Sequence, residues 1–106
     1  MTIERSALDV YNYVVEPKNL PKWASGLNAA VKVRFVERNK FGVLDHYVSI
    51  DSGPEVYMPM RVFPNGEGAE VLITVFRQPG VSDEKFAEDT QWVRRDLEAL
   101  KELLEK

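Results

Sequence analysis

Residues 82–106 read SDEKFAEDTQWVRRDLEALKELLEK, and this stretch decides the fold. Its mainly apolar positions recur every three or four residues, which places them on one face of an α-helix. These positions are Phe86, Thr90, Val93, Leu97, Leu100 and Leu104. Ser82 is a favourable N-cap, and Asp83 and Glu84 follow where the helix dipole favours acidic side chains. Because burying each large side chain gains roughly 1.5–3 kcal/mol, other elements must cover this face.

The composition indicates one ordinary globular domain spanning residues 1–106. A net charge of −3 and a pI near 5.2 argue against nucleic-acid binding, which relies on basic surfaces. The absence of cysteine excludes disulfides, thiolate nucleophiles and thiolate metal sites. We see neither a signal peptide nor an apolar run long enough to cross a bilayer. The expectation is a cytoplasmic protein with no nucleic-acid or membrane partner.

The N-terminal part of the chain predicts one short strand followed by two short helices. Residues 2–5 are expected to form the strand. Ser6 caps the first helix and Pro17 stops it, since proline removes a helical hydrogen bond. The second helix covers residues 19–24. We expect Trp23 in this helix to pack the helix pair against the sheet.

From residue 31 the apolar side chains alternate, as they do in half-buried strands. The predicted strands are 31–38, 43–50, 55–63 and 70–77. The short turns between them predict an antiparallel β-meander of about five strands, counting the first. A sheet with its helices grouped on one face is an α+β arrangement. So few strands cannot wrap a helix this long, so we expect either a partner chain over its far end or a partly open fold.

Three stretches carry a resemblance to a known superfamily: SALDVYNYV at 6–14, EPKNLPKW at 16–23 and WVRRDLEALK at 92–101. Together with the element order, they resemble the helix-grip fold of the START-like superfamily. This superfamily (SRPBCC proteins) includes birch-pollen-allergen-like proteins, polyketide cyclases/dehydrases and lipid-transport proteins, and the chain looks like a shortened bacterial member. The resemblance implies a hydrophobic small molecule bound between the long helix and the sheet.

The sequence departs from the superfamily by lacking one hairpin after the helix pair. Without it, residues 2–5 and 31–38 should both be edges of the sheet. Because an edge strand exposes unpaired backbone groups, it is a template for pairing with another chain. We therefore expect a homodimer formed through an exposed edge or face of the sheet.

His46 is the only histidine and the strongest candidate for acid–base chemistry. Alternation places it on the same face as Leu44, Val48 and Ile50, which we expect to face the long helix. The competing interpretation is a core histidine bonded to a neighbouring hydroxyl or carboxylate. Asp45 is adjacent in sequence but points to the opposite face, so the Asp-His dipeptide cannot form a catalytic pair.

Residues 55–63 present a second alternating apolar face that includes Met58 and Met60. Methionine suits adaptable pockets, but it also fills ordinary cores. Arg61 lies on the other face, either as an anchor for a carboxylate or as a solvated side chain. On the last strand both faces are apolar: one carries Leu72, Thr74 and Phe76, and the other carries Val71, Ile73 and Val75. A partner subunit would explain two apolar faces.

On the long helix, Asp89 either reaches a cavity or stays solvated. The expected ligand-binding set is His46, Met58, Met60, Arg61, Phe76, Phe86, Asp89 and Val93. A cavity of roughly a few hundred Å³ lined by His46 and the methionines would support it. No cofactor is expected, and the sequence has neither a phosphate-binding loop nor a metal-ligand pattern.

Three functions follow from these residues. The first is binding of a small hydrophobic ligand, and the second is a non-catalytic assembly domain with a reduced cavity that acts through dimerisation. The third is a cyclase/dehydratase-like enzyme with His46 as acid or base and Arg61 or Asp89 orienting the substrate.

Overall fold

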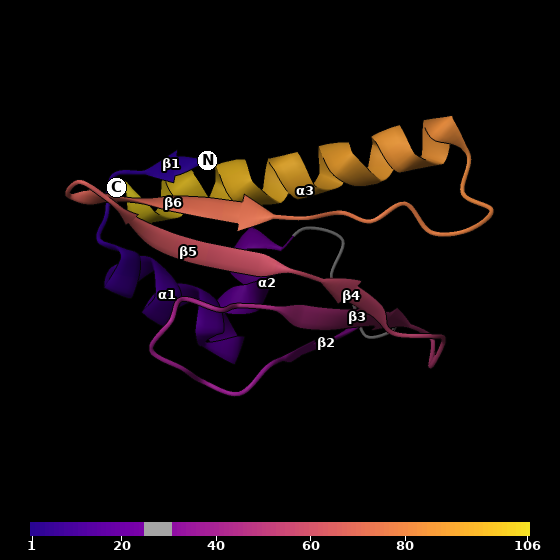
Figure 1. The fold of residues 1–106 in the computed structure, drawn as a ribbon, viewed down its shortest axis with the longest axis horizontal. Coiled ribbons are helices and arrows are strands. Elements are labelled where there is room, and N and C mark those ends of the chain that lie inside the picture. The colour runs from indigo at the N-terminus through magenta and orange to yellow at the C-terminus, as the bar shows by residue number, and fades with distance from the viewer. Residues whose placement is uncertain (25–30) are drawn as a thin grey trace.

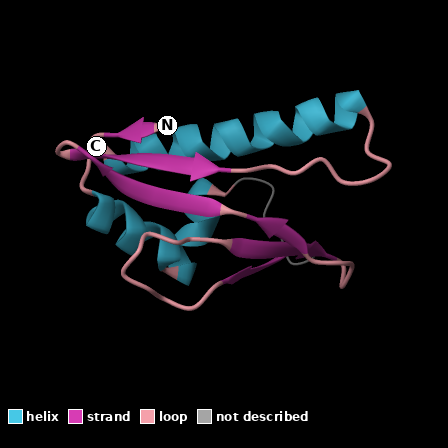
Figure 2. Ribbon diagram, viewed as in Figure 1, coloured by secondary structure: helices cyan, strands magenta, loops and turns pink. Residues whose placement is uncertain are grey.

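The structure, a computed structural model, describes residues 1–24 and 31–106. It is an α+β arrangement of antiparallel strands, short N-terminal helices and a long C-terminal helix (Figures 1 and 2). The elements are β1 (Thr2–Ile3), α1 (Ala7–Val15), η1 (Pro17–Asn19), α2 (Leu20–Trp23), β2 (Val31–Phe35), β3 (His46–Ile50), β4 (Val56–Met58), β5 (Met60–Asn65), β6 (Gly68–Ile73) and α3 (Asp83–Leu104).

The described strands form two antiparallel sheets of three strands each, instead of one meander of about five. One sheet has the order β1-β6-β5 and the other the order β2-β3-β4. The predicted strand 55–63 divides into β4 and β5 at Pro59, because proline cannot donate a hydrogen bond to the ladder. An isolated bridge between Val43 and Arg61 connects the segment before β3 to β5.

Helices α1 and α3 begin where the sequence predicts. The Ser6 hydroxyl accepts a hydrogen bond from the Asp9 N–H at 3.1 Å, and the Ser82 hydroxyl accepts one from the Lys85 N–H at the same distance. These bonds satisfy N–H groups that the first turn of a helix leaves unpaired. The helix starts are therefore local properties of the sequence.

The core lies between the β1-β6-β5 sheet, α1 and the C-terminal end of α3. Its fully buried large side chains are Ile3, Val10, Val14, Leu44, Met60, Val71 and Leu100. The structure settles which face of the last strand is inward: Val71 is completely buried, whereas Leu72 is 46% exposed. Packing against the helices makes this choice, since both faces of the strand are apolar.

The chain itself covers the C-terminal end of α3, where the sequence led us to expect either a partner chain or a partly open fold. Leu100 and Leu104 are buried. Lys101 donates to the Thr2 carbonyl at 2.7 Å, and Arg5 donates to the Leu104 carbonyl at 2.8 Å. Figure 1 shows that the N-terminal half of α3 instead extends beyond β6, beside the loop that leads into the helix. The fold is open at this end of the helix.

Candidate functional site

A cavity of about 140 Å³ lies between α2, the β2-β3-β4 sheet and α3. It is smaller than the few hundred Å³ that we expected of a ligand site. Most of its wall is apolar and comes from both sheets and both helices. These apolar side chains include Leu20, Val33, Val48, Met58, Ile73 and Val93.

His46 supplies a polar group in this apolar wall. The alternation of β3 turns His46 and Val48 inward, as the sequence predicts, and His46 is only 7% exposed. Nδ1 lies 3.0 Å from the carbonyl oxygen of Leu44. The ring also packs against Phe35, its partner on β2, with the ring centroids 5.0 Å apart.

Burial lowers the pKa of His46, and the Leu44 carbonyl and the Asp45 charge only partly oppose this effect. The imidazole is therefore neutral at physiological pH. A neutral ring donates from one nitrogen and accepts at the other. The burial of His46 agrees with a core histidine, but its partner among the described residues is a backbone carbonyl and not the expected hydroxyl or carboxylate.

Trp23 and Asp96 are the other polar side chains in the described wall. Trp23 is 4% exposed, and its indole N–H has no hydrogen-bond partner among the described residues. A buried unpaired donor costs about 1–3 kcal/mol, so packing of the indole ring has to offset this cost. Asp96 reaches the wall from α3 and has an interaction partner already.

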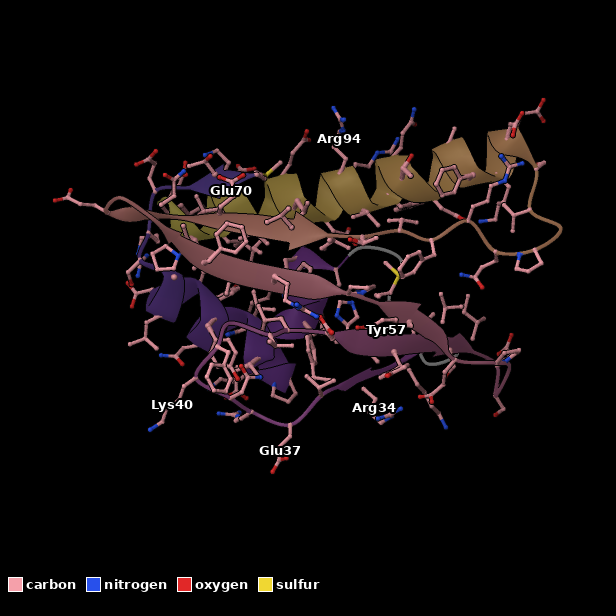
Figure 3. All side chains as sticks on the ribbon, in the orientation of Figure 1. Arg34, Glu37, Lys40, Tyr57, Glu70 and Arg94 are labelled. Carbon is pink, nitrogen blue, oxygen red and sulfur yellow. The ribbon has the colours of Figure 1, made fainter. Side chains whose placement is uncertain are left out.

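On the outer face of the sheets, Asp45 forms the centre of a second polar cluster. Its carboxylate accepts two hydrogen bonds from Arg61, each 2.9 Å long, and one from the Met60 N–H at 2.9 Å. The hydroxyl group of Tyr57, labelled in Figure 3, donates a hydrogen bond to the same carboxylate. The cluster joins the segment before β3 to β4 and β5, and so it connects the two sheets.

The same hydrogen bonds determine the pKa values in this cluster. The Arg61 guanidinium holds the pKa of Asp45 well below its usual range, with further help from Tyr57 and the Met60 N–H. In return, Asp45 raises the pKa values of Arg61 and Tyr57. Asp45 and His46 thus lie in separate environments on opposite faces, as alternation predicts.

Of the eight residues predicted to bind ligand, His46, Met58 and Val93 line the cavity. The other five lie elsewhere. Met60 is fully buried in the core, and Arg61 is bound to Asp45 on the outer face.

Phe76 also lies on the outer face, where it stacks on Tyr57 with ring centroids 6.3 Å apart. On α3, Phe86 packs beneath the Arg77 guanidinium and Asp89 pairs with Lys85. Neither side chain belongs to the described wall of the cavity.

The predicted set omitted eight of the described residues that line the cavity, among them Asp96 and Ile73. Asp96 lies three residues after Val93, a spacing that keeps both side chains on one side of a helix. This spacing could have indicated Asp96. Nothing comparable marked Ile73, because both faces of its strand are apolar.

Comparison of the chain with models of protein families gave no match, and comparison with curated proteins gave none either. Function must therefore be inferred from the geometry of the cavity. Within residues 1–24 and 31–106, no three His, Cys, Asp or Glu side chains are grouped to hold a metal ion. None of the helices in this part of the chain is long and apolar enough to cross a membrane.

Proposed function

We propose that this protein binds a small, largely apolar molecule in the cavity between α2, the β2-β3-β4 sheet and α3. The observation that carries this proposal is a cavity of about 140 Å³ with a mostly aliphatic wall. Engineered cavities of about 150 Å³ with similar walls bind benzene. Pockets for drug-sized molecules are larger, roughly 300–1,000 Å³. The ligand should therefore be about the size of a single ring.

Membership of the START-like superfamily, with its helix-grip arrangement, is part of the same proposal. Two features support it: the order of the helices and strands, and the position of the cavity between a long C-terminal helix and a sheet. In that superfamily the ligand lies between these same elements.

The direct test is mass spectrometry of small molecules released from protein purified under native conditions. The Val93→Phe variant serves as the comparison, because a larger side chain at this position fills the cavity from α3. Leu72→Phe is the matched control, since Leu72 lies on the exposed face of β6. We expect a ligand from the wild type and from Leu72→Phe, and a much smaller amount from Val93→Phe. Equal recovery from all three proteins contradicts a site in this cavity.

Self-association is a second candidate function, and the free edge of β6 favours it. Met1 exchanges two backbone hydrogen bonds with Val71, at 2.8 and 2.9 Å. The N–H and C=O of Ile73 point to the same side of β6 as those of Val71, and no described residue pairs with them. A groove lined by Val75 and Leu97 runs beside this edge. A strand of a second copy would complete the sheet here.

Sedimentation velocity at micromolar concentration tests this second candidate. We expect a dimer that dissociates when Ile73 is replaced by proline, which removes the N–H and disfavours strand pairing. A wild-type monomer contradicts it. Catalysis by His46 stays a prediction, and neither Arg61 nor Asp89 lies in the described wall to orient a substrate.

A further inference from the structure

His46 is more than nine-tenths buried, yet only one of its ring nitrogens has a partner within residues 1–24 and 31–106. That partner is the Leu44 carbonyl, 3.0 Å from Nδ1. Because a carbonyl oxygen can only accept, Nδ1 carries the proton of the neutral ring. Nε2, on the other side of the ring from this contact, carries a lone pair that no described residue is seen to engage. The cavity wall therefore contains a fixed hydrogen-bond acceptor.

A fixed acceptor restricts which ligands fit. A purely apolar ligand leaves Nε2 without a partner and forfeits a hydrogen bond. A carboxylate or carbonyl group could accept from the unpaired Trp23 N–H in the same wall, but it has no proton to donate to Nε2. A cationic amine loses its hydration in an apolar cavity, and Asp96, the carboxylate in the wall, is already engaged. A hydroxyl group donates while staying neutral, and it is small enough for this volume.

We propose that the ligand is a hydroxylated hydrocarbon of single-ring size, such as a phenol, whose hydroxyl group donates to Nε2 of His46. This inference rests on the proposed function, because it requires that the cavity be the binding site. It adds the chemical class of the ligand and gives His46 a role in recognition without any catalytic step.

Two probes of nearly the same shape test the inference. Phenol and toluene differ in that a hydroxyl replaces a methyl group, so a change in cavity volume affects both similarly. Benzoate and benzylamine extend the set to an anion and a cation. The affinities are measured by calorimetry at neutral pH, and the ¹⁵N resonance of Nε2 is recorded with each probe. That signal is unambiguous, since the chain has a single histidine.

Three variants separate hydrogen bonding from packing. His46→Leu removes the acceptor and keeps a side chain of similar size. His46→Gln restores an acceptor through its amide oxygen. Val48→Ala enlarges the same cavity without changing a polar group. We expect His46→Leu to lower the ratio of phenol to toluene affinity by roughly three- to tenfold, the effect of one net hydrogen bond. His46→Gln should recover part of this ratio, and Val48→Ala should leave it unchanged.

In the wild type, phenol should shift the Nε2 resonance and toluene should not, a result that stands even if His46→Leu fails to fold. An unchanged Nε2 resonance with bound phenol overturns the inference, and so does an unchanged ratio in a folded His46→Leu. Tighter binding of benzoate or benzylamine than of phenol overturns it as well. In each of these cases toluene binding keeps the proposed function intact. If none of the four probes binds, the proposed function itself is wrong.

Discussion

The carboxylate of Asp45 and the guanidinium of Arg61 form a two-point ion pair, with both N–H···O distances at 2.9 Å. Asp45 immediately precedes β3 in one sheet, and Arg61 belongs to β5 in the other. The carboxylate is buried, whereas the guanidinium is about half exposed. This pair therefore fixes the position of the two sheets relative to one another, and with it the wall of the cavity.

Replacing Asp45 by asparagine should destabilise the protein by about 2 kcal/mol. The side-chain amide of asparagine has one oxygen in place of two, so it cannot accept both hydrogen bonds from Arg61 in the same geometry. Urea denaturation measures this loss. Glu55→Gln is the control: Glu55 pairs with Arg34 on the surface, where both side chains are largely exposed. The control should have the midpoint of the wild type. Equal midpoints for Asp45→Asn and the wild type would show that the pair does not hold the sheets together.

Low pH should lower the folding stability of the protein through protonation of the same carboxylate. Arg61 lowers the pKa of Asp45 in the folded state, so its contribution to stability is complete above the unfolded pKa of about 3.9. The contribution is lost as the pH falls from there toward the folded pKa. Between about pH 4 and pH 2, Asp45→Asn should therefore show a shallower loss of stability than the wild type. Parallel curves over this interval would exclude Asp45 as the cause.

His46 should make stability depend on pH in a higher range. Burial lowers its pKa in the folded state, so the unfolded chain binds the proton more readily. Stability should then decrease as the pH falls below the unfolded value of about 6.5. His46→Gln, which does not titrate, should remove this dependence between about pH 6.5 and pH 5. NMR titration of the imidazole checks the direction of the shift independently.

Gly42 and Gly66 form a matched pair for a test of the backbone. Both have positive φ, 73° and 63°. A Cβ on Gly42 would lie 2.0 Å from the Val62 carbonyl oxygen, whereas a Cβ on Gly66 would meet nothing within 4 Å. Gly66→Ala should cost about 1 kcal/mol for the left-handed conformation alone.

Gly42→Ala should cost more than about 3 kcal/mol, because it also forces apart the Gly42 carbonyl and the Val62 N–H, which hydrogen-bond at 2.9 Å. Thermal denaturation compares the two variants. Similar melting temperatures would contradict the close approach of Gly42 to the backbone of β5 at Val62.

Local patterns predicted the helices well. The stripe on α3 and the caps at Ser6 and Ser82 depend on residues within one or two turns of each other, and the structure confirms them. The inward direction of His46 also follows from local alternation. These features need no knowledge of which strands pair.

The sequence did not reveal features that depend on contacts between distant residues. The strands divide into two sheets because Pro59 interrupts the predicted strand 55–63. The alternation of apolar side chains continues through this position, so the pattern alone predicts one strand. The bond between Asp45 and Arg61 depends on how β3 and β5 lie relative to each other, and periodicity carries no such information. The same limit explains why Phe86 and Asp89 were placed in the site: the stripe on α3 does not show where the sheet ends.

The methyl resonances of methionine test the central claim, binding in the cavity, most directly. Met58 lines the cavity, whereas Met60 is fully buried in the core and is absent from the described wall. Titration with toluene should shift the Met58 methyl resonance to saturation and leave that of Met60 nearly unchanged. The account is contradicted if the Met58 resonance stays constant in saturating toluene, or if the resonance of Met60 moves in its place.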